Sequence, residues 1–133
     1  MDAKDFLTVA ERYQASPREA ERRTSIGRSY YALFNFVKTI LEGSGVIFPG
    51  DASDHRKLVD YLIRAGHRVA ASTGQELKGL RSERNSADYE LRSLVPESSS
   101  QAVYARAISA ISRFEAIPAQ ELTQIVGKIQ KIP

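Results

Sequence analysis

The apolar residues of this 133-residue chain recur at the spacing of a helix in one segment after another, and no long stretch alternates as a strand does. The only strand-like segment is GVIF, at residues 45–48, which is too short and too isolated to pair. Helices whose apolar stripes face a shared interior form bundles. The sequence therefore predicts an all-α bundle of about five helices, with one long antiparallel pair, in a single domain over residues 1–133.

Capping residues indicate where the first two helices begin. A short first helix is expected over residues 3–15. Ser16 is the expected N-cap of a long second helix, with Pro17 at its first position and Glu19 three residues after the cap. This arrangement satisfies the free amide donors of a helix start. The second helix is expected to run to about Glu42, where the segment GSG ends it.

Three further segments complete the expected bundle. Ser53 or Asp54 can cap a third helix, which Gly66 closes, and a fourth is expected from about Gly74 to Leu94. Pro118 is expected to kink or split a last helical segment that follows the ESSS stretch. The aromatic residues of the long second helix repeat at the spacing of a core stripe, so we assign them first to the interior.

Composition excludes several kinds of site. The chain has no cysteine, which excludes disulfide frameworks and thiolate metal sites, and its two histidines do not stand at ligand spacing. We therefore expect no metal and no cofactor. The N-terminal segment lacks the apolar centre of a signal peptide, and no run approaches the ~20 apolar residues of a membrane span. We expect a soluble, cytoplasmic protein that does not interact with membranes.

The charged residues are spread along the whole chain. A balance of 19 basic and 16 acidic side chains, with net charge +3, permits a nucleic-acid partner without requiring one. Arg18, Arg22 and Arg23 are mixed with acids, so we assign them to a solvated face. His67 is assigned to the solvated surface. His55 is assigned to helix capping or packing, and a role in proton transfer stays open.

One predicted helix carries an arginine where a leucine would be expected. In and around the segment RSERNSADYELR, the side chains of Leu77, Leu80, Ala87 and Leu91 share one helical stripe, and Arg84 falls in the middle of it. A guanidinium cannot lose its proton to escape an apolar setting. It therefore needs a partner acid, a wet cleft or a bound anion.

Two interpretations of Arg84 stay open at this point. Asp88, four residues on, can form an internal pair with it at the edge of the core. Alternatively, Arg84 binds an anion in a cleft lined by helices. The second interpretation is supported by Arg81, Asn85 and Tyr89, which form a row at helical spacing on the neighbouring flank.

Three segments, in this order along the chain, resemble those of a known family. RSYYALFNFVKTIL lies on the long second helix, DHRKLVDYL follows after a turn, and LKGLRSERNSADYEL comes next. Together they resemble the small prokaryotic HEPN domains over residues 5–115. The resemblance implies a helical bundle that dimerises through the helix carrying the motif and, in many members, a metal-independent ribonuclease.

The resemblance also implies catalytic residues. Arg84 and Asn85 match the arginine and asparagine that open the family motif, and Tyr89 stands at the position of its histidine. In the implied reaction a ribose 2′-hydroxyl attacks the adjacent phosphate, the arginine stabilises the developing charge and the histidine exchanges protons. Phenols ionise near pH 10 and exchange protons poorly at neutral pH. The resemblance therefore predicts that cleavage is weakened or lost, and whether the chain is an enzyme stays open.

Three functions follow as expectations. The first is a module that binds or cleaves RNA or nucleotides, for example in a toxin–antitoxin or defence system, with Arg81, Arg84, Asp88 and Arg28 as its phosphate-binding residues. The second is a non-catalytic partner of a small nucleotidyltransferase, with Tyr89 as a candidate acceptor of the transferred nucleotide. The third is a plain helical dimerisation domain. We expect a homodimer, with RNA, a nucleotide, an antitoxin or the nucleotidyltransferase as its partner.

Overall fold

Six α-helices and no strand make up the protein in the computed structural model, which describes residues 1–133. The helices are α1 (Asp5–Tyr13), α2 (Glu19–Gly43), α3 (Asp54–Arg64), α4 (Arg68–Tyr89), α5 (Glu97–Glu115) and α6 (Ala119–Gln130). The predicted all-α bundle is confirmed. It has six helices rather than about five because Pro118 splits the last segment into α5 and α6.

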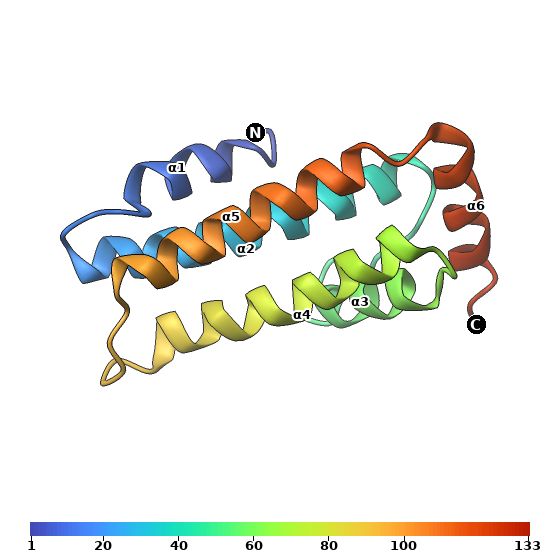
Figure 1. Cartoon of the computed structure of the whole chain (residues 1–133). Helices are drawn as coiled ribbons and strands as arrows, with labels where there is room; N and C mark the ends of the chain where they lie inside the picture. The colour runs from blue at the N-terminus through green and yellow to red at the C-terminus, as the bar shows by residue number, and fades with distance from the viewer.

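The long helix α2 is at the centre of the bundle (Figure 1). It contacts α1, α4 and α5, while α3 lies against α4, and α6 packs on α3. The colours of Figure 1 show that α2 and α4 run in opposite directions, as expected for the long antiparallel pair. None of the helices is long and apolar enough to cross a membrane.

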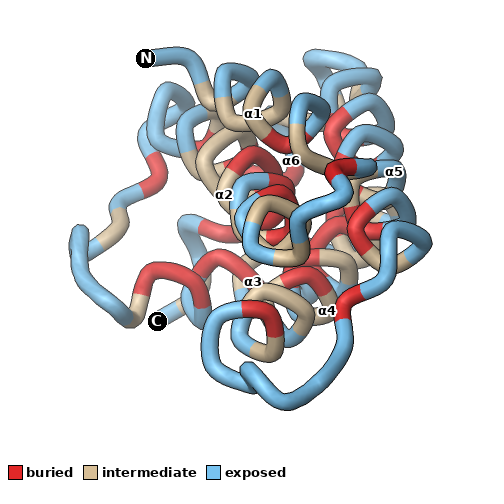
Figure 2. Tube along the Cα trace, turned by 90° about the vertical axis from the view of Figure 1, so that its left-hand side faces the viewer, coloured by how far each residue is buried: buried red, intermediate tan, exposed pale blue.

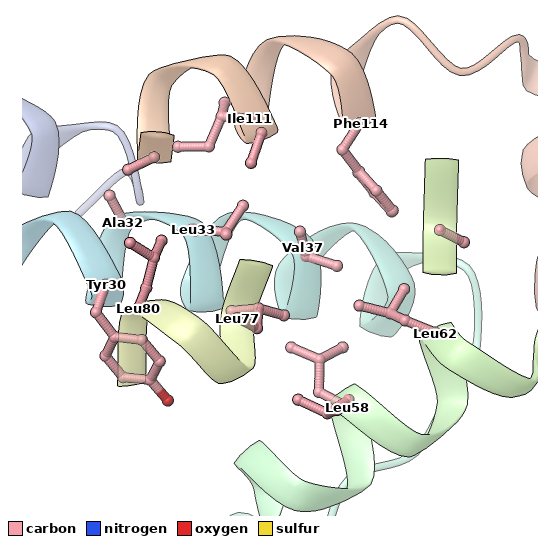
Figure 3. Packing of buried hydrophobic residues seen from close by; sticks show 14 of the residues in the cluster. Tyr30, Ala32, Leu33, Val37, Leu58, Leu62, Leu77, Leu80, Ile111 and Phe114 are labelled. Atoms are coloured by element: carbon pink, nitrogen blue, oxygen red, sulfur yellow. The ribbon is translucent and has the colours of Figure 1, made fainter. Parts of the chain in front are cut away.

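The core is one cluster of apolar side chains enclosed by these helices. Figure 2 shows the buried residues on the inward turns of the helices, with exposed chain in the connections. In Figure 3, leucines of α3 and α4 point toward side chains of α2 and α5. Leu77, Leu80 and Ala87 are buried as expected, whereas Leu91 is 74% exposed because α4 ends before it.

The start of α2 differs from the expected capping arrangement. The Ser16 hydroxyl accepts a hydrogen bond from the amide of Arg18 (3.1 Å) and donates one to the carboxylate of Glu21 (2.6 Å). Arg18 is the N-cap residue, and Pro17 stays outside the helix. The prediction of Ser16 as N-cap is therefore wrong, because its hydroxyl organises the turn that leads into α2.

A buried carboxylate positions the start of α3. Ser53 precedes the helix as N-cap residue, but its hydroxyl donates to Asp51 (2.6 Å) and accepts no hydrogen bond from a helix amide. The carboxylate of Asp54 accepts a hydrogen bond from the amide of Gly50 (3.0 Å) and lies 3.2 Å from Nζ of Lys38 in α2. Asp54 thus holds the preceding loop against α2, and it places the first turn of α3, which carries His55.

The helix α4 begins earlier than expected because a histidine caps it. Nδ1 of His67 accepts hydrogen bonds from the amides of Val69 (3.2 Å) and Ala70 (3.4 Å). Gly66, which closes α3 as predicted, has a φ of +68°, a conformation that favours glycine. Nε2 of His67 lies 2.7 Å from a carboxylate oxygen of Glu121 in α6. The assignment of His67 to the solvated surface is therefore wrong.

The helix α4 ends at Tyr89, where arginines of α2 hold the chain that follows. The guanidinium of Arg23 donates hydrogen bonds to carbonyl oxygens at this end, those of Ala87, Glu90 and Ser93. Nε of Arg22 donates to the carbonyl oxygen of Val95 (2.8 Å). The assignment of Arg22 and Arg23 to a solvated face is wrong, because main-chain oxygens satisfy their donors. Only Arg18 of this group is exposed.

Candidate functional site

Three pockets on the surface meet at His55 of α3 and Arg81 of α4. The polar groove has a volume of about 480 Å³ and is lined by His55, Lys78, Arg81, Ser82, Asn85, Ser86, Tyr89 and Glu90. The aromatic pocket, of about 350 Å³, is lined by Tyr30, Tyr31, Phe34, Lys38, Gly50, Asp51, Ala52, Asp54, His55, Arg81 and Arg84. The side pocket, of about 360 Å³, is lined by His55, Arg56, Val59, Asp60, Ile63, Lys78 and Arg81. Because they share two residues, we treat them as one branched cleft.

Arg81 is the unpaired cation at the centre of the branched cleft. Its side chain is half-buried, and it forms no ion pair within the chain. Lys78, one turn earlier on α4, is likewise without an ion pair. A guanidinium keeps its charge on partial burial, so an anion entering the cleft would stabilise Arg81.

Arg84, in contrast, is paired within the protein. Its Nε lies 3.1 Å from Oδ2 of Asp88 in an ion pair, although the angle does not make this contact a hydrogen bond. Its Nη1 donates to Oδ1 of Asn85 (3.4 Å), and its guanidinium lies 5.2 Å from the centre of the Tyr31 ring. The internal pair, one of the two interpretations of the sequence, is thus present. Arg84 also borders the aromatic pocket.

His55 lies where the three pockets meet, and its side chain is 9% exposed. Its Nδ1 is 2.6 Å from the hydroxyl of Tyr30. Its other ring nitrogen, Nε2, has no partner in the chain and is not among the buried unpaired atoms, so it faces the cleft. Burial and, to a smaller extent, the charge of Arg81 lower the pKa of His55 to about 4. The imidazole is therefore neutral at pH 7.

The hydroxyl of Tyr30 decides which nitrogen of His55 carries the proton. Burial raises the pKa of Tyr30 to about 12, although the charge of Arg81 acts against this rise. The phenol therefore keeps its proton, and in Figure 3 its hydroxyl points away from Leu33. We assign the proton of the neutral imidazole to Nε2, because Nδ1 can then accept a hydrogen bond from this hydroxyl. His55 thus presents an N–H donor to the branched cleft.

The other residues predicted for the site divide into two that line the cleft and two that do not. Asn85 and Tyr89 line the polar groove, and Tyr89 is 75% exposed at the end of α4. Asp88 borders none of the three pockets. Arg28 lies outside the cleft, with its guanidinium 5.7 Å from the centre of the Phe6 ring. The expected row on α4 is therefore assembled, but Arg28 does not join it.

Sequence reasoning did not bring α2 and α3 together at one cleft, because it assigned the aromatic residues of α2 first to the interior and His55 to capping or packing. Tyr30 is buried as expected, yet it also lines the aromatic pocket with Tyr31 and Phe34. The contact between Tyr30 and His55 joins residues 25 positions apart, so no local spacing reveals it. The available signal was that both residues belong to segments that carry the family resemblance.

Hydrogen-bond donors border the branched cleft together with the carboxylates of Asp51, Asp54, Asp60 and Glu90. Arg81, Lys78, the side-chain amide of Asn85 and Nε2–H of His55 border it. Donors of this kind bind oxyanions such as phosphate. No cluster of three or more histidine, cysteine or carboxylate side chains that could hold a metal ion is present in the fold.

Comparison of the chain with protein-family models, with curated proteins and with solved structures finds no match.

Proposed function

We propose that the protein binds RNA through its phosphate groups in the branched cleft and cleaves it weakly or not at all. The observation that carries this proposal is Arg81, a half-buried and unpaired guanidinium beside Nε2–H of His55. Phosphate oxygens accept hydrogen bonds from both groups, and the charge-assisted bonds to arginine are the stronger ones. The HEPN resemblance favours RNA as the molecule that supplies the phosphate.

The positions of the protons argue against efficient cleavage. Removal of a proton from a 2′-hydroxyl at pH 7 needs an acceptor whose pKa lies near 7. Nε2 of His55 already carries a proton, and a pKa of about 4 makes this imidazole a weak base. Tyr89, at the position of the family histidine, offers only a phenol. The cleft therefore retains the groups that bind a phosphate and lacks a well-matched base.

Replacement of Arg81 tests the binding of RNA. We expect Arg81→Ala to weaken the binding of a labelled unpaired RNA about tenfold and to lower the slope of log affinity against log salt by about 1, the contribution of one phosphate contact. Fluorescence anisotropy over a salt series measures both. Arg113→Ala is the matched control, because Arg113 is an exposed arginine of α5 outside the cleft. Equal affinities for the two variants would show that Arg81 does not contribute to RNA binding.

The same preparations test cleavage in the presence of a metal chelator. We expect little or no cleavage by the wild-type protein, and about 10²-fold more by Tyr89→His, because a histidine supplies a matched base. The products should carry cyclic phosphate ends, and Arg84→Ala should abolish the cleavage. Rapid cutting by the wild-type protein would contradict the assignment of weakened activity.

One observation favours a second candidate function. Tyr89 is 75% exposed, so its hydroxyl is accessible to another enzyme. This position suits the acceptor of a nucleotide transferred by a partner nucleotidyltransferase. If RNA does not bind, intact mass measurement of the protein purified with such a partner would show whether Tyr89 has gained a nucleotide.

A further inference from the structure

The aromatic pocket and the polar groove lie on two sides of His55 and Arg81, and they differ in chemistry. Rings of α2 line the aromatic pocket, whereas serine, asparagine and lysine side chains of α4 line the polar groove. A phosphate bound at Arg81 therefore has an aromatic surface on one side and a polar channel on the other. A chain of nucleotides presents the same alternation of charged phosphate and flat base.

The rings of the aromatic pocket form a fixed surface. The ring of Phe34 is nearly parallel to that of His55, with centres 6.2 Å apart and an interplanar angle of 23°. It is also nearly parallel to the ring of Tyr30, at 5.8 Å and 25°. The guanidinium of Arg84, which also lines the pocket, lies 5.2 Å from the centre of the Tyr31 ring. Phe34 and Tyr31 remain only half-buried, so part of each ring borders the open volume.

Two carboxylates supply hydrogen-bond acceptors in the aromatic pocket. Asp51 and Asp54 both line it, and the pKa of Asp51 is lowered chiefly by its side-chain hydrogen bond with Ser53. Asp51 is therefore ionised at neutral pH, and Asp54 is paired with Lys38, which also lines the pocket. A nucleobase is uncharged, and its N–H groups can donate to these oxygens. The volume of about 350 Å³ is at the lower end of the range for small-ligand sites.

We propose that the aromatic pocket binds one unpaired nucleobase, so that the ligand of the branched cleft is single-stranded RNA with a base beside the phosphate held by Arg81. The base stacks on Phe34 and Tyr31, which is the common mode of recognition for unpaired bases. A base inside a duplex is already stacked and paired and cannot enter. The inference rests on the proposed function, because the pocket is placed beside the phosphate site.

Three ligands of equal length distinguish the binding of the base from the binding of the phosphate. They are a labelled oligoadenylate, the same strand paired in a duplex, and a strand whose sugars carry no bases. We expect the wild-type protein to bind the oligoadenylate about tenfold more tightly than either of the others, the contribution of one base stacked on an aromatic side chain. Fluorescence anisotropy gives the three affinities under one salt condition.

Variants of α2 then assign the preference to the aromatic pocket. Phe34→Leu removes a ring from the pocket and should bind the oligoadenylate no better than the strand without bases. Phe36→Leu is the matched control on the same helix, because Phe36 is also half-buried but lies near Lys4 and outside the pocket. Ala52→Trp fills the pocket from an exposed position and should cause the same loss without disturbing the core.

The outcomes distinguish this inference from the proposed function. If the wild-type protein binds strands with and without bases equally, or Phe34→Leu and Ala52→Trp keep its preference, the base pocket is refuted and the phosphate site stands. Binding of the duplex as tight as that of the unpaired strand also refutes it. If none of the three ligands binds, the proposed function is refuted as well.

Discussion

At the scale of single residues, the hydrogen bond between Tyr30 and His55 links the protonation of a cleft residue to the stability of the fold. A histidine that is neutral in the folded protein resists protonation, whereas the same side chain in the unfolded chain accepts a proton near pH 6.5. Between these two pKa values the unfolded state binds more protons than the folded state. The free energy of unfolding must then fall as the pH is lowered through this window.

Replacement of His55 tests this coupling. The folded pKa of about 4 lies below the ordinary value of 6.5, so the stabilisation is complete above pH 6.5 and is lost as the pH falls toward 4. We expect the wild-type protein to lose about 2 kcal/mol more than His55→Gln over this range. The expected loss is smaller than the full linkage value of about 1.36 kcal/mol for each unit of pKa shift, because Nε2 faces water, which screens the effect. Urea unfolding at several pH values measures the difference, and parallel curves for the two proteins would contradict the assignment.

The question raised by Arg84 shows how far single residues could be understood from the sequence. Its spacing from Asp88 indicated the internal pair as one of two interpretations, because partners four residues apart on a helix are neighbours. The unpaired state of Arg81 could not be predicted, because it depends on which acids of other helices come close. His55 was assigned to capping or packing and is buried, but its contact with Tyr30 could not be predicted because that partner lies on α2.

At the scale of helices, existence and order were predictable and boundaries were not. Apolar periodicity and the break at Pro118 predicted the all-helical fold. The start of α4 depends on a histidine cap, which is not among the common capping residues. Its end depends on Arg23, more than 60 residues earlier in the chain, whose contact with Ala87 spans 64 positions. Local sequence carries no signal for such a distant hydrogen bond.

A glycine of α4 sets its close approach to α3. A Cβ atom on Gly74 would lie 3.0 Å from Cγ1 of Ile63 and 3.3 Å from the carbonyl oxygen of Val59. We expect Gly74→Ala to lower the free energy of unfolding by about 1–2 kcal/mol, because overpacking outweighs the gain in helix propensity. The control is Gly127→Ala in α6, where nothing lies within 4 Å and a gain of up to about 1 kcal/mol is expected.

Denaturant unfolding measures both variants, and we expect the free energy of unfolding to fall for Gly74→Ala and to rise for Gly127→Ala. Stabilisation by both substitutions would show that α3 and α4 have room to move apart. Since α3 carries His55 into the branched cleft, Gly74→Ala should also weaken RNA binding, whereas Gly127→Ala should leave it unchanged.

At the scale of the whole molecule, the homodimer stays a prediction. The buried stripe of α4 and the aromatic segment of α2 are largely covered within one chain. Exposed apolar side chains remain near the end of α4, at Tyr89, Leu91 and Leu94. We expect light scattering to give the mass of a dimer and Leu91→Glu with Leu94→Glu to give a monomer, because charges oppose apolar association. A monomeric wild-type protein at all concentrations would refute the dimer.

The way in which α2 holds the end of α4 has a consequence for how this protein can change in evolution. Arg22 and Arg23 bind carbonyl oxygens, which every residue possesses, so the hold does not depend on the side chains of residues 90–95. The exposed side chains of residues 90–94 can therefore be replaced without releasing the main chain beneath them, whereas Val95 packs in the core. Relatives of this protein are free to acquire new partners at this surface while the neighbouring cleft keeps its shape.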